Sequence, residues 1–94
     1  MSDELETTLI LLECCIINNE MPDFLDVYYS EGVINILVAT DNYKSYNVSE
    51  RIKGVFEIIG WEYPEILDNY PVIVNCLTLS ELDEFFKMRH YETI

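Results

Sequence analysis

The chain has 94 residues, half of them hydrophobic, and its 5 basic and 18 acidic side chains give it a net charge of −13. A chain this short and this apolar predicts one folded domain over residues 1–94 and argues against intrinsic disorder. Surplus negative charge repels phosphate backbones and anionic lipid headgroups, so it disfavours nucleic acids and membranes as partners and favours a basic protein. The charge also keeps a small apolar protein soluble, and that simpler alternative stays open.

The first predicted element is a helix that Ser2 or Asp3 caps and that ends before Pro22. Its own side chains are apolar on nearly all sides, because the segment 9–17 is apolar except at Glu13. Such a helix needs cover on two sides, from the domain's own sheet and from either another helix or another chain. A homodimer is one expectation that this helix leaves open.

A β-hairpin is predicted next. Segments 24–29 and 33–40 are rich in β-branched and aromatic residues, and Ser30-Glu31-Gly32 separates them. Gly32 supplies the positive φ that a tight hairpin turn requires. The second of these strands has apolar residues on both faces, which indicates the central strand of the sheet.

The second half of the sequence predicts a helix, a strand and a last helix. An amphipathic helix is capped either by Asn47, which with Glu50 has capping-box spacing, or one turn later by Ser49. It ends at Gly60, with Arg51 facing water. Segment 61–69 is irregular or briefly helical, with Trp61 expected in the core. Pro71 opens a strand over residues 72–77, and Ser80 caps the last helix. The predicted class is α+β, with a three-stranded sheet and three helices in the order α-β-β-α-β-α.

Residues suited to catalysis or metal binding are scarce in this sequence. The one histidine, His90, lies four residues from the end, and no Gly-rich phosphate loop occurs. Zinc would have to be held by Cys14, Cys15, Cys76 and His90, but neighbours on a helix point about 100° apart. We therefore expect a non-enzymatic protein with packed thiols and neither metal nor cofactor.

The cellular compartment is predicted from the cysteines and the first residues. Three cysteines, two of them adjacent, make a poor disulfide framework and indicate a reducing compartment. The first residues are acidic where a secretory signal begins with bases, and no apolar run is long enough to span a bilayer. We expect a cytoplasmic protein.

Tyrosine is abundant, with seven copies. Tyrosine suits interfaces because it joins a large apolar ring to a hydroxyl group. Tyr43 and Tyr46, in the polar segment before the second helix, are the best interface candidates, with packing onto the sheet edge as the alternative. The full set of candidate partner-binding residues is Asp23, Asp26, Asp41, Tyr43, Tyr46 and Arg51.

Four motifs together resemble the BolA-like family. They are Phe24-Leu25-Asp26-Val27, then residues 36–43 ending in Tyr43, then Arg51 with Phe56 at the family's spacing, and finally residues 80–85. The resemblance covers residues 24–86 and implies a KH-like α+β fold and a habit of binding proteins. In the family a histidine follows the helix arginine and can ligate an iron–sulfur cluster shared with a monothiol glutaredoxin.

Ile52 holds the place of that histidine, so the cluster-ligand role does not transfer. The family's DNA-binding role conflicts with a net charge of −13. Arg51 is the one charged residue whose position matches that of a charged residue in the family. The alternative is that Arg51 is an ordinary solvated residue of the helix.

The sequence therefore favours a small intracellular protein-binding or regulatory module that acts through an acidic, tyrosine-bearing surface. A second hypothesis is an acidic nucleic-acid mimic, of the phage type, that inhibits a DNA- or RNA-handling enzyme. The mimic requires carboxylates spaced like phosphates along one face.

Overall fold

A computed structural model describes the backbone of residues 2–92 and the side chains of residues 2–88. The elements in chain order are α1 (Asp3–Glu20), β1 (Phe24–Ser30), β2 (Val33–Ala39), the 3-10 helix η1 (Asp41–Ser45), α2 (Val48–Glu62), α3 (Pro64–Asn69), β3 (Val72–Leu77) and α4 (Leu79–Glu92). The α+β class and the three-stranded sheet are confirmed. The predicted count of three helices is wrong, because α3 is a fourth α-helix within the described residues.

The break between α2 and α3 has a local cause. A residue that precedes proline is disfavoured in the α conformation. Tyr63 accordingly leaves it, with φ −140° and ψ 62°, and Pro64 then starts α3 at the first helical position. The predicted stop at Gly60 is therefore two residues too early. Trp61, in this last turn of α2, is 78% exposed, so its predicted place in the core is wrong.

The sheet has the order β1-β2-β3. Strand β1 pairs with β2 in the antiparallel direction, and β2 pairs with β3 in the parallel direction. The central position predicted for β2 is confirmed, and five of its seven residues are buried. A two-residue turn joins β1 to β2, and both of its residues have positive φ, 53° at Glu31 and 81° at Gly32. These are the dihedrals of the turn that matches the twist of a hairpin, so the prediction for Gly32 is confirmed.

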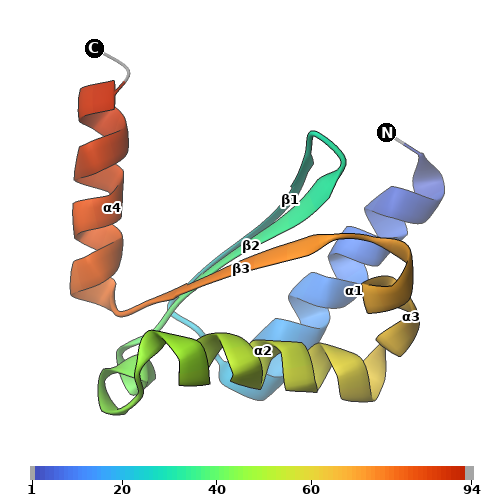
Figure 1. Ribbon diagram of the computed structural model, residues 1–94, viewed down its shortest axis with the longest axis horizontal. Helices are drawn as coiled ribbons and strands as arrows, with labels where there is room; N and C mark the ends of the chain where they lie inside the picture. The colour runs from blue at the N-terminus through green and yellow to red at the C-terminus, as the bar shows by residue number, and fades with distance from the viewer. Residues whose placement is uncertain (1, 93–94) are drawn as a thin grey trace.

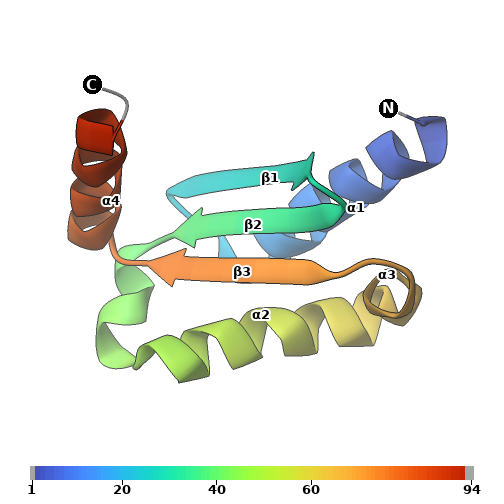
Figure 2. The ribbon, with the colours of Figure 1, turned by 45° about the horizontal axis from the view of Figure 1, so that its top comes forward.

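The helices divide unequally between the two faces of the sheet. Figures 1 and 2 show α1 and α2 beneath one face, whereas α4 rises at the far end on the other side. The main core lies between the sheet and α1, α2 and α3, and its fully buried members include Leu12, Ile36 and Ile59. A smaller cluster joins Leu82 of α4 to Leu37 and Ala39 of β2.

The helix ends follow the capping rules, with one correction. Ser2 caps α1 by accepting a hydrogen bond from the Leu5 backbone, and Asn47 and Glu50 form the predicted capping box on α2. Ser80 does not cap α4. Thr78 and Glu81 do so, since the Thr78 Oγ1 accepts from the Glu81 backbone at 3.3 Å and Glu81 Oε1 accepts from the Thr78 backbone at 2.8 Å.

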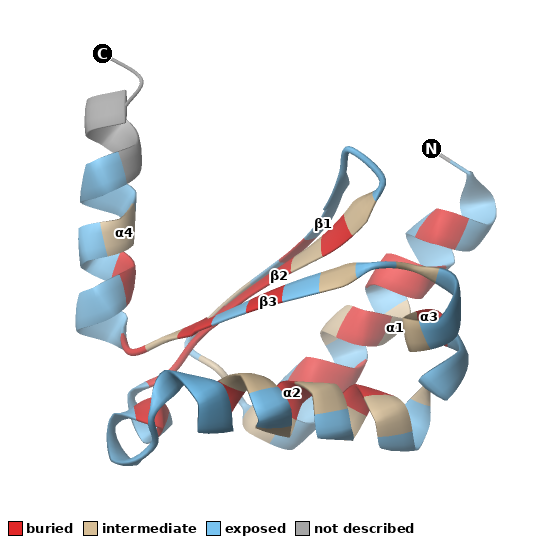
Figure 3. Cartoon of the chain, viewed as in Figure 1, coloured by how far each residue is buried: buried red, intermediate tan, exposed pale blue. Residues whose placement is uncertain are grey.

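The first helix is covered on one side only. Its buried residues face the sheet and α2, and its outer side is exposed, as Figure 3 shows by the alternation of red and blue along α1. Cover by the sheet and a second helix is thus observed, but it leaves part of the apolar surface in water. Within residues 2–92, no helix combines the length and hydrophobicity that crossing a bilayer requires.

Candidate functional site

A surface hollow of about 230 Å³ lies where η1 and the start of α2 meet the end of α1. We name it the η1–α2 hollow, and it is lined by Glu20, Tyr43, Tyr46, Glu50, Arg51 and Gly54. Three of the six candidate residues, Tyr43, Tyr46 and Arg51, come together here. Sequence reasoning missed Glu20 as a lining residue, because no local pattern indicates that the end of α1 returns to the start of α2.

Arg51 is the most connected side chain at this site and is only 8% exposed. Its Nε donates to the Tyr46 carbonyl at 2.9 Å, and its Nη1 donates to the Cys76 carbonyl at 3.3 Å and to Glu81 Oε1 at 2.8 Å. The guanidinium also lies 5.7 Å from the centroid of the Tyr43 ring. The expectation of a solvated helix residue is wrong. Arg51 fastens α2 to η1, to the end of β3 and to the start of α4.

The carboxylate of Glu81 balances this buried charge. The Thr78 backbone N–H and the Arg51 guanidinium both donate to Glu81, and they hold its pKa below the usual value of 4.5. Because the depressed pKa belongs to the folded state, this contribution to stability is present above pH 4.5 and is lost as the pH falls through the folded pKa.

Tyr43 forms the floor of the hollow and is 5% exposed, so its ring packs into the core rather than standing at an interface. Its hydroxyl lies close to the Cys76 thiol and finds no partner with ordinary hydrogen-bond geometry. Burial raises the pKa of Tyr43 above its ordinary value and raises that of Cys76 to about 11. Both groups are therefore protonated at neutral pH, and the thiol is not a nucleophile there.

The rim of the hollow is acidic and aromatic. Tyr46 is 54% exposed. Glu50 is exposed and uses Oε1 to accept the capping bond from Asn47 at 3.0 Å, which leaves its second oxygen without an assigned role. Glu20 is partly buried, and this burial raises its pKa. Two carboxylates beside an exposed ring suit a cationic group better than an anion.

The other three candidate residues lie elsewhere. Asp41 Oδ1 accepts a hydrogen bond from the Leu79 backbone at 3.3 Å, and its Oδ2 lies 3.6 Å from Lys44 Nζ, so it supports the start of α4. Asp23 is exposed just before β1. Asp26 is exposed on the sheet face opposite α1 and α2, where it lines a small hollow of about 60 Å³ beside α4. The structure does not gather the predicted acids into one surface.

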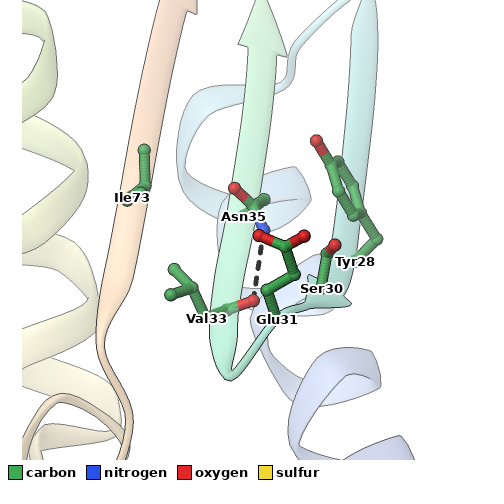
Figure 4. A pocket seen from close by; sticks show the side chains of 6 residues that line it. All are labelled: Tyr28, Ser30, Glu31, Val33, Asn35 and Ile73. Carbon is green, nitrogen blue, oxygen red and sulfur yellow. Dashed lines mark hydrogen bonds between the residues drawn. The ribbon is translucent and has the colours of Figure 1, made fainter.

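A third hollow, of about 200 Å³, lies on the same sheet face near the hairpin turn (Figure 4). Its lining comes from all three strands and consists of Tyr28, Ser30, Glu31, Val33, Asn35 and Ile73. The Asn35 amide donates to the Val33 carbonyl at 3.1 Å, so one of its polar groups is occupied. With a single carboxylate, this hollow offers fewer converging charged groups than the η1–α2 hollow.

All three cysteines are free. Cys14 is exposed on α1, whereas Cys15 is buried beneath it and Cys76 is buried in β3. Burial, with a smaller effect of Glu62, raises the pKa of Cys15 to about 12. Among the side chains of residues 2–88, no three His, Cys, Asp or Glu residues converge as a metal site would require. The side chain of His90 lies outside the described residues.

The Tyr43 hydroxyl gives a testable consequence. Replacing Tyr43 by Phe removes a buried polar atom that has no partner of ordinary geometry, so we expect the free energy of unfolding to stay the same or to rise by up to about 1 kcal/mol. Urea unfolding followed by circular dichroism measures the change. A loss of more than about 1 kcal/mol would mean that the hydroxyl has a strong partner after all.

Comparisons with known proteins place the chain in no family. No protein-family model matches it, and neither the curated proteins nor the solved structures contain a significant match.

Proposed function

We propose that this protein is a non-enzymatic binding module that takes a lysine or arginine side chain of a protein partner into the η1–α2 hollow. The observation that carries the proposal is that Glu20, Glu50 and the exposed Tyr46 line one hollow of about 230 Å³. A cation in that space would gain two carboxylate partners and an aromatic face.

The residues that line the hollow indicate that its ligand is positively charged. Arg51 is the only base among the lining residues, and its guanidinium already donates to two backbone carbonyls and to Glu81. Its positive charge is therefore balanced inside the protein rather than offered to a ligand. The net charge of −13 adds a long-range attraction for basic partners.

We also propose that the fold is BolA-like and hence KH-like. The element order supports this assignment apart from the additional helix α3, because the resemblance implies the order α-β-β-α-β-α. Ile52, at the place of the family's histidine, packs against the core, which is consistent with a member that binds proteins without ligating a cluster. Three free cysteines support a location in the reducing cytoplasm.

The nucleic-acid mimic is less well supported. Its carboxylates would have to follow one face, like phosphates along a strand. Exposed acids come instead from every helix that the structure describes, from β1 and from the hairpin turn. No specific observation favours that function over the basic protein partner.

A nuclear magnetic resonance titration tests the proposal. The probes are blocked pentapeptides of glycine whose central residue is arginine, lysine or glutamine, added to the ¹⁵N-labelled protein. We expect the two basic peptides to shift the amide signals of Tyr46, Glu50 and Gly54, and the glutamine peptide to leave them unchanged. The double variant Glu20→Gln, Glu50→Gln should raise the Kd about fivefold, because two ion pairs in an open surface hollow contribute about 0.5 kcal/mol each.

The matched control is Glu65→Gln with Glu84→Gln, which removes the same charge from exposed positions on α3 and α4. Glutamine at position 50 keeps the oxygen that caps α2, so the fold is preserved. Equal weakening by the two double variants, or shifts spread evenly over the molecule, would show a general charge effect and overturn the proposed site.

A further inference from the structure

The outer side of α1 carries an apolar stripe that nothing in the described structure covers. We name it the outer seam. Four of its five residues are apolar and one is a threonine: Thr7, Ile10, Cys14, Ile17 and Met21. Ile10 is 58% exposed, Ile17 is 49% exposed and Met21, which ends the helix, is 78% exposed. Scattered apolar side chains are normal on a surface, but a continuous row of them on one helix is not.

The spacing of the outer seam is that of a coiled-coil helix. Its members are separated alternately by three and four residues, which is the heptad pattern, and they extend over about 20 Å of helix. The buried face of α1, with Leu9, Leu12 and Ile16 among its members, is already packed against the protein's own core. The seam is thus a second apolar face of α1, on the side that points away from the domain.

One flank of the outer seam is acidic at the same period. Glu6 and Glu13 each precede a seam residue by one position, seven residues apart, and Glu20 at the edge of the η1–α2 hollow continues the series. In coiled coils the residues at this flanking position form ion pairs with the facing helix and select the partner. No base occurs before Lys44, so α1 itself offers no compensating charge.

We propose that the outer seam docks an amphipathic helix of a partner protein that has a heptad apolar stripe flanked by lysine or arginine. Its apolar residues lie along Ile10, Cys14 and Ile17, and its bases pair with Glu6 and Glu13. A second copy of this chain has the right apolar stripe and the wrong flank, since it brings more glutamates and a further charge of −13. The short seam indicates a transient complex rather than an obligate one.

Two designed helical peptides of three heptads test the proposal. Both have leucine along the stripe, and the flanking positions are lysine in one peptide and glutamate in the other. Fluorescence anisotropy at about 0.15 M salt, where exposed charges are screened beyond roughly 8 Å, measures the Kd. We expect the lysine peptide to bind and the glutamate peptide not to bind. The variant Ile10→Gln, Ile17→Gln should raise the Kd of the lysine peptide at least about tenfold.

Charge reversal gives the decisive comparison. Glu6→Lys with Glu13→Lys should transfer the preference to the glutamate peptide, whereas Glu65→Lys with Glu84→Lys, an equal change on α3 and α4, should keep the lysine preference. Far-UV circular dichroism checks that each variant keeps its helices. If both reversals weaken lysine-peptide binding equally, or if the glutamine variant binds as well as the original, the seam is not the docking surface.

Analytical ultracentrifugation tests the alternative that a second copy of this chain occupies the outer seam. If the unmodified protein forms a dimer that Ile10→Gln, Ile17→Gln abolishes, a second copy occupies the seam and the basic-partner proposal is wrong. A monomer at the concentrations of the peptide assay is the expected result. None of the substituted residues lines the η1–α2 hollow, so failure of this proposal and failure of the proposed function are distinguishable.

Discussion

Replacing Arg51 by Met is expected to cost about 3 kcal/mol of the free energy of unfolding, because it removes a buried guanidinium and three hydrogen bonds that contribute about 1 kcal/mol or more each. The substitution leaves the carbonyls of Tyr46 and Cys76 without the donor that now satisfies them. A domain of this size has a stability of roughly 5 kcal/mol or a little more. Most of the protein's stability would then be lost, and urea unfolding followed by circular dichroism measures the change.

The control for this prediction is Lys53→Met, on the same helix. The Lys53 side chain is 78% exposed and lies 4.0 Å from Glu57, so the exposed pair should contribute less than about 0.5 kcal/mol. A similar small loss in the Arg51 variant would mean that the network does not hold α2 against β3 and α4. Arg51→Lys should fall between the two, since lysine keeps the charge but lacks the fork of donors that reaches both carbonyls.

Replacing Leu12 by Ala should destabilise the protein by about 3 to 4 kcal/mol. Leu12 is fully buried between α1 and the sheet, and truncating such a side chain removes its burial and leaves a cavity. The midpoint of urea unfolding should move to lower concentration with little change of slope.

Ile10→Ala, two residues away, is the matched control. Ile10 is 58% exposed, so its truncation should change the free energy of unfolding by less than about 1 kcal/mol. If the control costs as much as Leu12→Ala, the outer seam is covered in the isolated protein. That result would favour a homodimer and would contradict the one-sided burial of α1.

Short-range signals predicted most elements well. The amphipathic spacing of α2, its capping box of Asn47 with Glu50 and the turn at Gly32 all depend on residues within a few positions of one another. Helical spacing and turn type follow directly from the geometry of the backbone, so these local patterns are enough to predict the elements. The errors at Gly60 and Ser80 are boundary errors of the same local kind, where the restriction before Pro64 and the competing cap at Thr78 decided the ends.

The candidate site was predicted only in part. Tyr43 and Tyr46 are near neighbours in one polar segment, and nothing in that segment says that one ring is 5% exposed and the other 54% exposed. Trp61 was expected inside and lies outside for the same reason. Which side of a short connection faces the core depends on how the adjoining helices pack, and that packing involves residues far away in the chain.

By itself the sequence determined the α+β class, the central strand β2, a first helix with two apolar faces and the excess of negative charge. Each of these depends only on composition or on the spacing of apolar residues within a single helix or strand. Tertiary structure alone decided that Arg51 is buried against Cys76 and Glu81, that Glu20 and Glu50 line the same hollow, and that one apolar side of α1 stays in water. The contacts of Arg51 join residues that are 25 and 30 positions apart in the chain. They depend on which faces of the helices pack against the three-stranded sheet.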